Sequence, residues 1–249
     1  MLAHSLDGPD GAPVVVLSNS LGTTPEMWDG QLLALAEHFC VLRYDHRGHG
    51  RSPVPPGPYT IEDLGSDLLA ALDRLGIERA SLCGLSLGGM VSMWVASEAP
   101  DRVDRLVLCN TSAYMGPPER WTERATLVRE QGTDAIVDGA IERWLTPAGR
   151  GTRAEQRLRA MLHATPDEGY ASCCEAVGST DLRDRLAAIR APTLVIAGAD
   201  DPALPPERAR RLADAIRGAR LEVIERGAHL VNVERPEEFN RALLGHLAV

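Results

Sequence analysis

The sequence has 249 residues, of which 44% are hydrophobic and 24% are charged, and its formal net charge is −9. This length and composition are those of one folded α/β domain, or of one domain with an insertion. The negative charge argues against binding to nucleic acid or to an anionic membrane, because both need a basic surface. It does not exclude a small anionic substrate, since a pocket can have a positive potential of its own.

Residues 1–11 lack the basic and apolar segments of a signal peptide, and no apolar run reaches membrane-spanning length. The five cysteines are odd in number, and none of them belongs to a C-x-x-C pair. We therefore expect a cytoplasmic protein with reduced thiols.

Short apolar runs alternate with helical patterns along most of the chain. Strands are predicted at 13–18, 40–44, 80–83, 104–110, 192–197 and 221–224. Helices are predicted at about 28–39, 61–75, 87–98, 206–216 and 236–247, the second of them capped by Thr60. This alternation predicts a mostly parallel sheet with helices on both faces.

The strand rhythm stops between about residues 115 and 186. There, large apolar residues such as Trp121, Leu127, Ile141 and Leu158 recur at helical spacings among many charges. We expect a lid of short helices at 115–186, inserted between two parts of the core, residues 1–114 and 187–249.

The segment Gly84-Leu85-Ser86-Leu87-Gly88 has the pattern G-x-S-x-G between a predicted strand and a predicted helix. In this context the serine lies on a strained turn with its hydroxyl exposed, and the start of the helix stabilises negative charge beside it. The pattern alone is equally compatible with a glycine-rich turn of any α/β protein.

Two further loops at the same edge of the sheet carry reactive side chains. Asp200 and Asp201 follow the strand at 192–197, and His229 follows the strand at 221–224. Functional groups of parallel sheets collect at these carboxyl ends, and the order Ser, Asp, His is typical of α/β-hydrolase triads. The alternative for His229 is a surface loop histidine.

Each member of the triad would have a defined role. Ser86 would attack as the nucleophile, His229 would take its proton, and a carboxylate would orient the imidazole. Asp200 and Asp201 compete for the last role, and we prefer Asp201 because it precedes Pro202 at the turn, as in the family that the chain resembles (see below). The backbone amides of Leu21 and Leu87 would bind the oxyanion.

The loop at 45–52 contains His46 and His49, which could be read as metal ligands. No carboxylate or cysteine stands at ligand spacing from them, so we predict a glycine-rich structural loop that braces the nucleophile turn. No metal and no cofactor are expected.

Five segments of the chain resemble the α/β-hydrolase superfamily, namely 13–22, 45–52, 84–89, 191–206 and 227–234. A narrower resemblance, to the 3-oxoadipate enol-lactonases of the β-ketoadipate pathway, rests on four motifs. They are LSNSLGT at 17–23, where most of the superfamily has His-Gly, ERWLTP at 142–147, GYASCCEA at 169–176 and DLR at 181–183.

The resemblance implies an α/β-hydrolase fold and a serine hydrolase that opens the lactone ring of 3-oxoadipate enol-lactone, giving 3-oxoadipate through an acyl-enzyme. The substrate carboxylate would need a cationic partner, for which Arg120, Arg124 and Arg143 are candidates. Each of them could instead lie on a solvated helix face. Trp121 and Trp144 either line the pocket or anchor the lid by packing.

Other hydrolases share the same triad, so a carboxylesterase, another lactonase or a C–C bond hydrolase remains an alternative. A non-catalytic ligand receptor on this fold is disfavoured, because it has no need of Ser86, Asp201 and His229 together. The segment before residue 13 is shorter than in the enol-lactonases, which leaves open whether the first edge strand is present.

Overall fold

The computed structural model describes residues 1–248 and contains one seven-stranded sheet with the strand order β1-β3-β2-β4-β5-β6-β7. All neighbouring strands are parallel except β1, which runs antiparallel to β3. The predicted, mostly parallel sheet is therefore confirmed. The strands are β1 (His4–Asp7), β2 (Val14–Ser18), β3 (Cys40–Tyr44), β4 (Ala80–Leu85), β5 (Val103–Cys109), β6 (Thr193–Gly198) and β7 (Arg220–Ile224).

The first edge strand, which the sequence analysis left open, is present. Strand β1 pairs with β3 in the register His4 to Tyr44, and the amide of Ala3 donates to Ser52 Oγ at 2.9 Å. An edge strand needs a partner on one side only, so four residues are enough to form it. Its side chains are mostly half-buried and lack apolar alternation, which explains why the sequence pattern did not reveal it.

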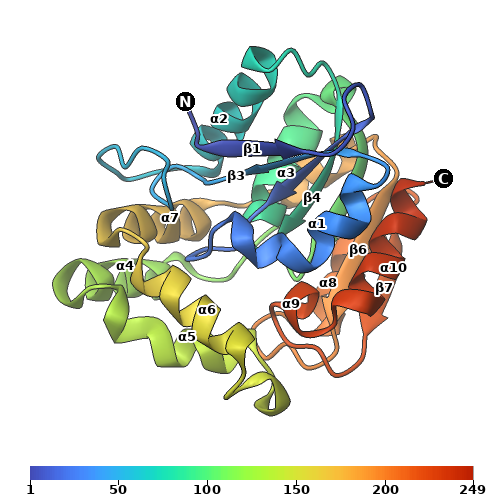
Figure 1. Ribbon diagram of the computed structural model, residues 1–249. Helices are drawn as coiled ribbons and strands as arrows, with labels where there is room; N and C mark the ends of the chain where they lie inside the picture. The colour runs from blue at the N-terminus through green and yellow to red at the C-terminus, as the bar shows by residue number, and fades with distance from the viewer. Residues whose placement is uncertain (249) are drawn as a thin grey trace.

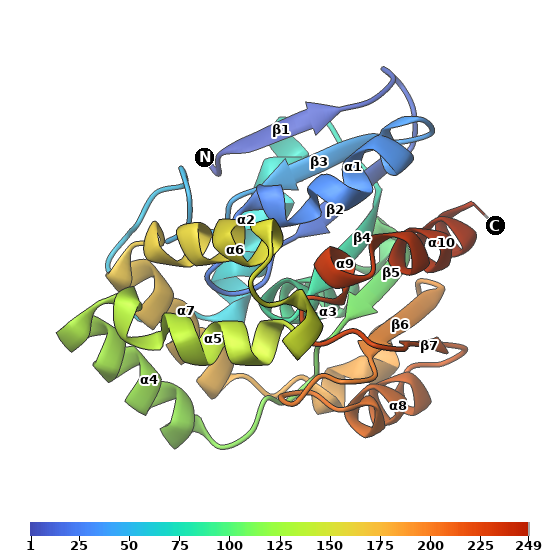
Figure 2. The same ribbon diagram turned by 60° about the horizontal axis from the view of Figure 1, so that its bottom comes forward.

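The sheet is covered by helices on both faces (Figure 2). Helices α1 and α10 pack together on one face, α2 and α3 pack together on the other, and α8 contacts β6 and β7. The bounds are α1 (Asp29–Ala36), α2 (Ile61–Arg74), α3 (Leu87–Glu98), α8 (Pro206–Ala215), α9 (Val231–Glu234) and α10 (Pro236–Leu247). In the described chain, no helix combines the length and the apolarity that crossing a bilayer requires.

Local sequence signals set several helix ends. Thr60 caps α2 through a capping box with Asp63, whose amide donates to Thr60 Oγ1 at 3.0 Å, as predicted for Thr60. The helix expected at 28–39 is shorter, because a 3₁₀ helix at Pro25–Trp28 precedes α1 and the chain leaves the helix after Ala36.

Strands β4 and β5 and helix α3 form the centre of the core. Every residue of β4 is buried, as expected for a strand covered on both faces. In α3, residues 87–96 are all buried, including Trp94, which is 6% exposed and packs in the core as its position on this helix indicates. Ser86 thus stands between two of the most buried elements of the molecule.

A block of helices separates β5 from β6 and forms a layer of its own beside the sheet (Figure 1). We call residues 115–186 the helical insertion. Its helices α4 and α7 pack closely against each other, and α5 packs against α6. The bounds are α4 (Pro118–Gln131), α5 (Val137–Trp144), α6 (Arg153–His163) and α7 (Asp167–Ser179), with 3₁₀ helices at Thr133–Ile136, Pro147–Gly149 and Arg183–Ala188.

Candidate active site

Ser86 joins β4 to α3 in a strained conformation, with φ 54° and ψ −113°. Its amide donates to Cys109 O at 3.0 Å, and its carbonyl accepts from Thr111 Oγ1 at 2.7 Å. A Cβ on Gly84 would lie 2.2 Å from Gly88 O, so the turn closes only with glycine there. Such strain at a non-glycine residue costs about 1–3 kcal/mol and persists where the surroundings enforce it, often at functional sites.

Asp201 and His229 lie together at the ends of β6 and β7. His229 Nδ1 donates to Asp201 Oδ2 at 2.7 Å, while Asp201 Oδ1 accepts from the amides of Ala203 at 2.8 Å and Leu204 at 3.0 Å. Asp201 is 2% exposed and His229 is 6% exposed. The Asp200 side chain is exposed and takes no part in this network. Of the two aspartates, the one that contacts His229 is Asp201.

Burial acts on the Asp201 carboxyl by raising its pKa, but its hydrogen-bond partners act more strongly in the opposite direction. His229, together with the amides of Leu204 and Ala203, holds the pKa of Asp201 below its ordinary value. The carboxylate is therefore ionised at neutral pH and available to orient the imidazole and to stabilise its protonated form.

Ser86 and His229 line the same cavity. Within residues 1–248, no hydrogen bond joins the serine hydroxyl to the imidazole, in contrast to the bond between His229 and Asp201. Nucleophile–base contacts are often long without substrate and shorten when it binds. The arrangement has the parts that acyl transfer requires, with the remaining imidazole nitrogen, Nε2, free to accept a proton.

The residues expected to supply oxyanion donors meet beside Ser86. Leu21 lies in the turn that follows β2, which we call the β2 turn (residues 19–23), and Leu87 is the first residue of α3. Neither amide has a hydrogen-bond partner in the part of the chain that the structure describes. Asn19 O accepts from the Gly88 amide at 3.0 Å, which ties the β2 turn to the start of α3.

His46 and His49 are buried in the loop at 45–52, which we call the histidine loop. Their hydrogen bonds go to Gly22 and Asn19 of the β2 turn, which the Gly88 amide joins to the start of α3. Burial lowers the pKa of His46 to about 3, with a contribution from His49, and lowers that of His49 to about 4. Residues 1–248 contain no cluster of three His, Cys, Asp or Glu side chains suited to a metal ion.

The helical insertion supplies one wall of the cavity, and this wall is cationic. It includes Arg120, which is exposed, and Arg124 and Arg143, which are half-buried. Among the described residues, none of the three forms an ion pair with a carboxylate. Burial, the charge of Arg124 and the charge of Arg120 lower the pKa of Arg143.

Trp121 and Trp144 line this wall beside the arginines. The Arg124 guanidinium lies 5.1 Å from the centre of the Trp121 ring, within the range of a cation–π contact. Trp144 is 5% exposed and belongs to the hydrophobic core as well as to the cavity lining. It therefore does both: it packs in the core and lines the cavity.

Asn110 is a site residue that the sequence analysis treated only as the end of a strand. Its Nδ2 donates to Asp201 Oδ2 at 2.8 Å and to Ala228 O at 3.1 Å, and its Oδ1 accepts from the Gly198 amide at 3.1 Å. It adopts φ 39°, a region that asparagine tolerates better than most residues. The signal that could have identified Asn110 as a site residue was its position, a polar side chain at the carboxyl end of a predicted strand.

Glu234 was also missed, since its role depends on contacts distant in sequence. Its Oε2 accepts from the Ala228 amide at 2.7 Å, and its Oε1 accepts from the Thr146 amide and hydroxyl, both at 2.8 Å. The His229 amide donates to Arg143 O at 3.4 Å nearby. The loop of the catalytic-base candidate is therefore bonded directly to the end of α5.

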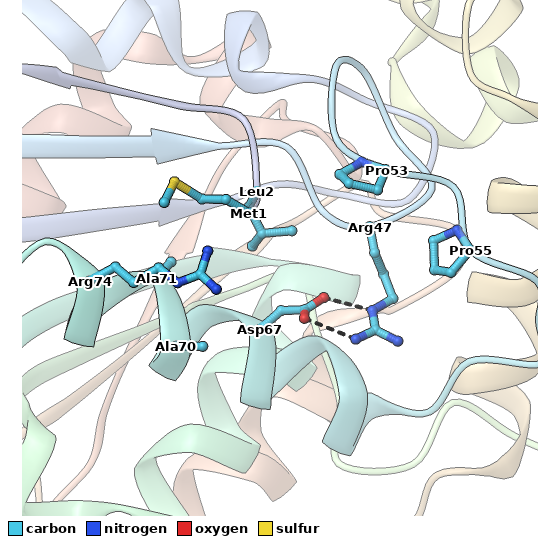
Figure 3. A pocket seen from close by; sticks show the side chains of 9 residues that line it. All are labelled: Met1, Leu2, Arg47, Pro53, Pro55, Asp67, Ala70, Ala71 and Arg74. Atoms are coloured by element: carbon cyan, nitrogen blue, oxygen red, sulfur yellow. Dashed lines mark hydrogen bonds and ion pairs between the residues drawn. The ribbon is translucent and has the colours of Figure 1, made fainter.

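Another cavity lies away from Ser86, between the N-terminus, the histidine loop and α2 (Figure 3). Its most buried charged groups, Arg47 and Asp67, neutralise each other through two hydrogen bonds of 2.6 and 2.9 Å. Its lining has no nucleophile beside a base. This cavity therefore lacks the combination of groups found beside Ser86.

Comparisons with known proteins agree with this fold and site. A model of the alpha/beta hydrolase family matches residues 14–242. The chain is 41% identical to 3-oxoadipate enol-lactonase 2 of Acinetobacter baylyi, over 97% of this chain and 91% of that protein. It is 36% identical to the putative carbamate hydrolase RutD of Pseudomonas savastanoi, over 95% of this chain and 94% of that protein.

Among solved structures, the enol-lactonase from Burkholderia xenovorans superposes with a TM-score of 0.97 at 44% identity, covering 100% of this chain and 96% of that one. The predicted fold class and the resemblance to enol-lactonases are confirmed. The chain belongs to the α/β-hydrolase family and is a hydrolase.

Proposed function

We propose that the protein is a serine hydrolase that opens the lactone ring of 3-oxoadipate enol-lactone. The observation that carries the proposal is the cavity itself, which has Ser86 and His229 on one wall and Arg124 and Arg143, without carboxylate partners among residues 1–248, on the other. A small substrate with an ester bond and a carboxylate is complementary to both walls. The identity to 3-oxoadipate enol-lactonase 2 supports the same substrate.

In the proposed reaction, Ser86 Oγ attacks the lactone carbonyl while His229 Nε2 takes the hydroxyl proton. Asp201 holds His229 in the tautomer with a proton on Nδ1 and stabilises the imidazolium. The amides of Leu21 and Leu87 bind the oxyanion, a contribution of roughly 3–4 kcal/mol per donor in other hydrolases.

Collapse of this intermediate breaks the bond from the carbonyl carbon to the ring oxygen. The leaving group is an enol oxygen that receives the proton from His229 and tautomerises to a ketone, so ring opening is favourable. Water, deprotonated by His229, then attacks the acyl-enzyme and releases 3-oxoadipate together with the Ser86 hydroxyl.

Arg124 and Arg143 would hold the carboxylate of the substrate through the reaction, with Arg120 at the mouth of the cavity. Trp121 and Trp144 would contribute apolar surface against the ring. The arginines line the same cavity as Ser86, so one small molecule can reach both the nucleophile and a cationic partner.

Carbamate hydrolysis is the second candidate, because the chain is 36% identical to a putative carbamate hydrolase over most of its length. The chemistry of Ser86 would be the same, and the substrate would differ. The two candidates are separated by substrate comparison.

The test measures hydrolysis of freshly prepared 3-oxoadipate enol-lactone, p-nitrophenyl acetate and a small carbamate ester by the wild type and by Ser86→Ala. We expect the lactone to be the best substrate by kcat/KM, with a loss in the variant on the order of 10⁶-fold in kcat. Activity on the acetate or carbamate without activity on the lactone would reject the substrate, and an active Ser86→Ala would reject the mechanism.

A further inference from the structure

The histidine loop holds the β2 turn through two imidazole rings. His49 Nε2 accepts a hydrogen bond from the Gly22 amide at 2.9 Å, and His46 Nε2 lies 3.2 Å from Asn19 O. Both rings are fully buried, His49 with 0% and His46 with 1% of its surface exposed. His46 is one of several partners of Asn19, whose carbonyl also accepts from the Gly88 amide, whereas the Gly22 amide has His49 as its partner.

The partners of the two rings require opposite tautomers. The Gly22 amide can only donate, so His49 Nε2 carries no proton and its Nδ1 proton faces Arg47 O at 3.4 Å. Asn19 O can only accept, so His46 carries its proton on Nε2. Both rings are neutral at pH 7, because burial lowers their pKa values far below that pH.

The histidine loop is itself anchored to the core. Arg47, between the two histidines, reaches α2 and forms two hydrogen bonds with the Asp67 carboxylate, which Figure 3 shows as dashed lines. The Ser52 hydroxyl donates to Asp45 O at 2.7 Å and closes the loop. The position of His49 is therefore determined by α2 and the sheet.

The opposite side of the β2 turn is closed by the helical insertion. Gly22 has φ +76°, and a Cβ there would lie 2.6 Å from a methyl group of Leu162 and 3.0 Å from the Tyr170 ring. With its amide held by His49, Gly22 leaves the adjacent Leu21 amide free on the cavity wall. Without an acceptor at this position, the buried Gly22 N–H would have no partner and the turn would rotate to find one.

We infer that His49 is a positioning residue for the oxyanion site: by accepting the Gly22 N–H, it fixes the Leu21 N–H toward the oxygen of the tetrahedral intermediate. This inference rests on the proposed function, since it assigns a role in acyl transfer at Ser86. His49 contacts neither the substrate nor the reacting atoms. Its effect therefore appears in the transition state and not in substrate binding.

The test compares three substitutions of His49 that differ in whether they offer an acceptor to the Gly22 amide. His49→Gln places an amide oxygen where Nε2 lies, His49→Asn is too short to reach Gly22, and His49→Phe keeps the ring without an acceptor. Cys173→Ala is the matched control, because Cys173 Sγ lies 4.0 Å from Nδ1 on the side of the ring away from Gly22. Kinetics are measured with the lactone and with p-nitrophenyl acetate.

Loss of a whole oxyanion donor lowers kcat on the order of 10²–10³-fold, and a donor that is only displaced should cost less. We therefore expect His49→Asn and His49→Phe to lower kcat about 10–100-fold. KM should stay within about twofold in all three variants, because binding of the substrate in its ground state is unchanged. His49→Gln should recover most of kcat, because its amide oxygen again accepts from the Gly22 amide. Cys173→Ala should resemble the wild type.

Titration with a small alkyl boronic acid gives a second readout, because its adduct with Ser86 places a negatively charged oxygen in the oxyanion site. Its affinity should fall in His49→Asn by the same factor as kcat, whereas the affinity for 3-oxoadipate should not change. If His49→Phe does not fold, His49→Gln against His49→Asn decides the question.

Equal activity of all variants, equal loss in His49→Gln and His49→Asn, or a change confined to KM would overturn the inference. Failure of the proposed function gives a different result. If the wild type hydrolyses the acetate but not the lactone, and Ser86→Ala hydrolyses neither, the lactone is rejected as the substrate. The His49 variants can then still be compared on the acetate. An active Ser86→Ala rejects the acyl-transfer mechanism itself.

Discussion

The two walls of the active-site cavity are held in place by different kinds of interaction. On the core wall, Ser86, Asp201 and His229 are each less than a tenth exposed and are positioned by backbone strain and buried hydrogen bonds. On the wall from the helical insertion, Arg124 and Arg143 line the cavity without ion-pair partners among residues 1–248. Arg129, on the same helix as Arg124, instead forms ion pairs with Glu168 and Glu175 outside the cavity.

This difference separates chemistry from recognition. Acyl transfer depends on positions accurate to a fraction of an ångström, which a buried and fully hydrogen-bonded network provides. Recognition of a carboxylate depends on charge, which acts over longer distances and tolerates movement of the side chain. A half-buried arginine without a partner destabilises the folded protein, so its presence at a cavity is a reason to expect an anionic ligand.

After Ser86→Ala, the largest effect should come from a change in the core wall at Asp201. Asp201→Asn replaces the acceptor of the His229 Nδ1 proton by an amide and favours the wrong tautomer, so we expect kcat to fall about 10⁴-fold with the fold intact. The measurement is kcat on the lactone, with circular dichroism as a check of folding. Asp200→Asn is the control and should stay within about twofold of the wild type. A larger loss from Asp200→Asn would reverse the assignment.

A smaller and more selective effect should follow from a change in the arginine wall. Arg143→Met keeps the aliphatic stem and removes the charge, and a hydrogen bond to a charged group contributes about 1.5–3 kcal/mol, so KM for the lactone should rise about 10–100-fold. Its backbone carbonyl, which accepts from the His229 amide, is unaffected. Steady-state kinetics with both substrates checks this.

For p-nitrophenyl acetate, which has no carboxylate, Arg143→Met should leave KM and kcat nearly unchanged. Arg129→Met is the matched arginine control, because that side chain pairs with Glu168 and Glu175 outside the cavity. An equal fall in kcat for both substrates would mean that Arg143 supports the core wall and does not select the substrate.

The smallest effect concerns stability on the outer side of the helical insertion. Arg129 and then Ser172 hold the pKa of Glu168 at about 2, below its ordinary value. A depressed carboxyl pKa contributes stability that is present above about pH 4.5 and is lost as the pH falls toward 2. Because this pair is partly exposed, its contribution at pH 7 should be below about 1 kcal/mol.

Chemical unfolding of the wild type and of Arg129→Met between pH 7 and pH 3 measures this contribution. The difference in unfolding free energy should shrink as the pH falls below about 4.5, while activity at pH 7 stays the same. A difference that grows in acid would contradict the sign of the Glu168 shift.

Much of the fold was predictable because its signals are local. Continuous apolar runs specify β4 and β6, and Thr60 with Asp63 specifies the start of α2, since both depend on near neighbours in the sequence. The edge strand β1 was not predictable in this way, because one antiparallel partner stabilises it and its own four residues carry little pattern.

Residue type and the preceding strand were enough to single out Ser86, His229 and the pair Asp200 and Asp201 as candidates, because they define what a side chain can do and on which edge of the sheet it lies. Which of these groups meet depends on the tertiary structure. It pairs Asp201 with His229, attaches Asn110 and Glu234 to them, and brings His49 against Gly22. Each of these contacts joins elements that are distant in the chain, and their geometry depends on the packing of the whole sheet and its helices.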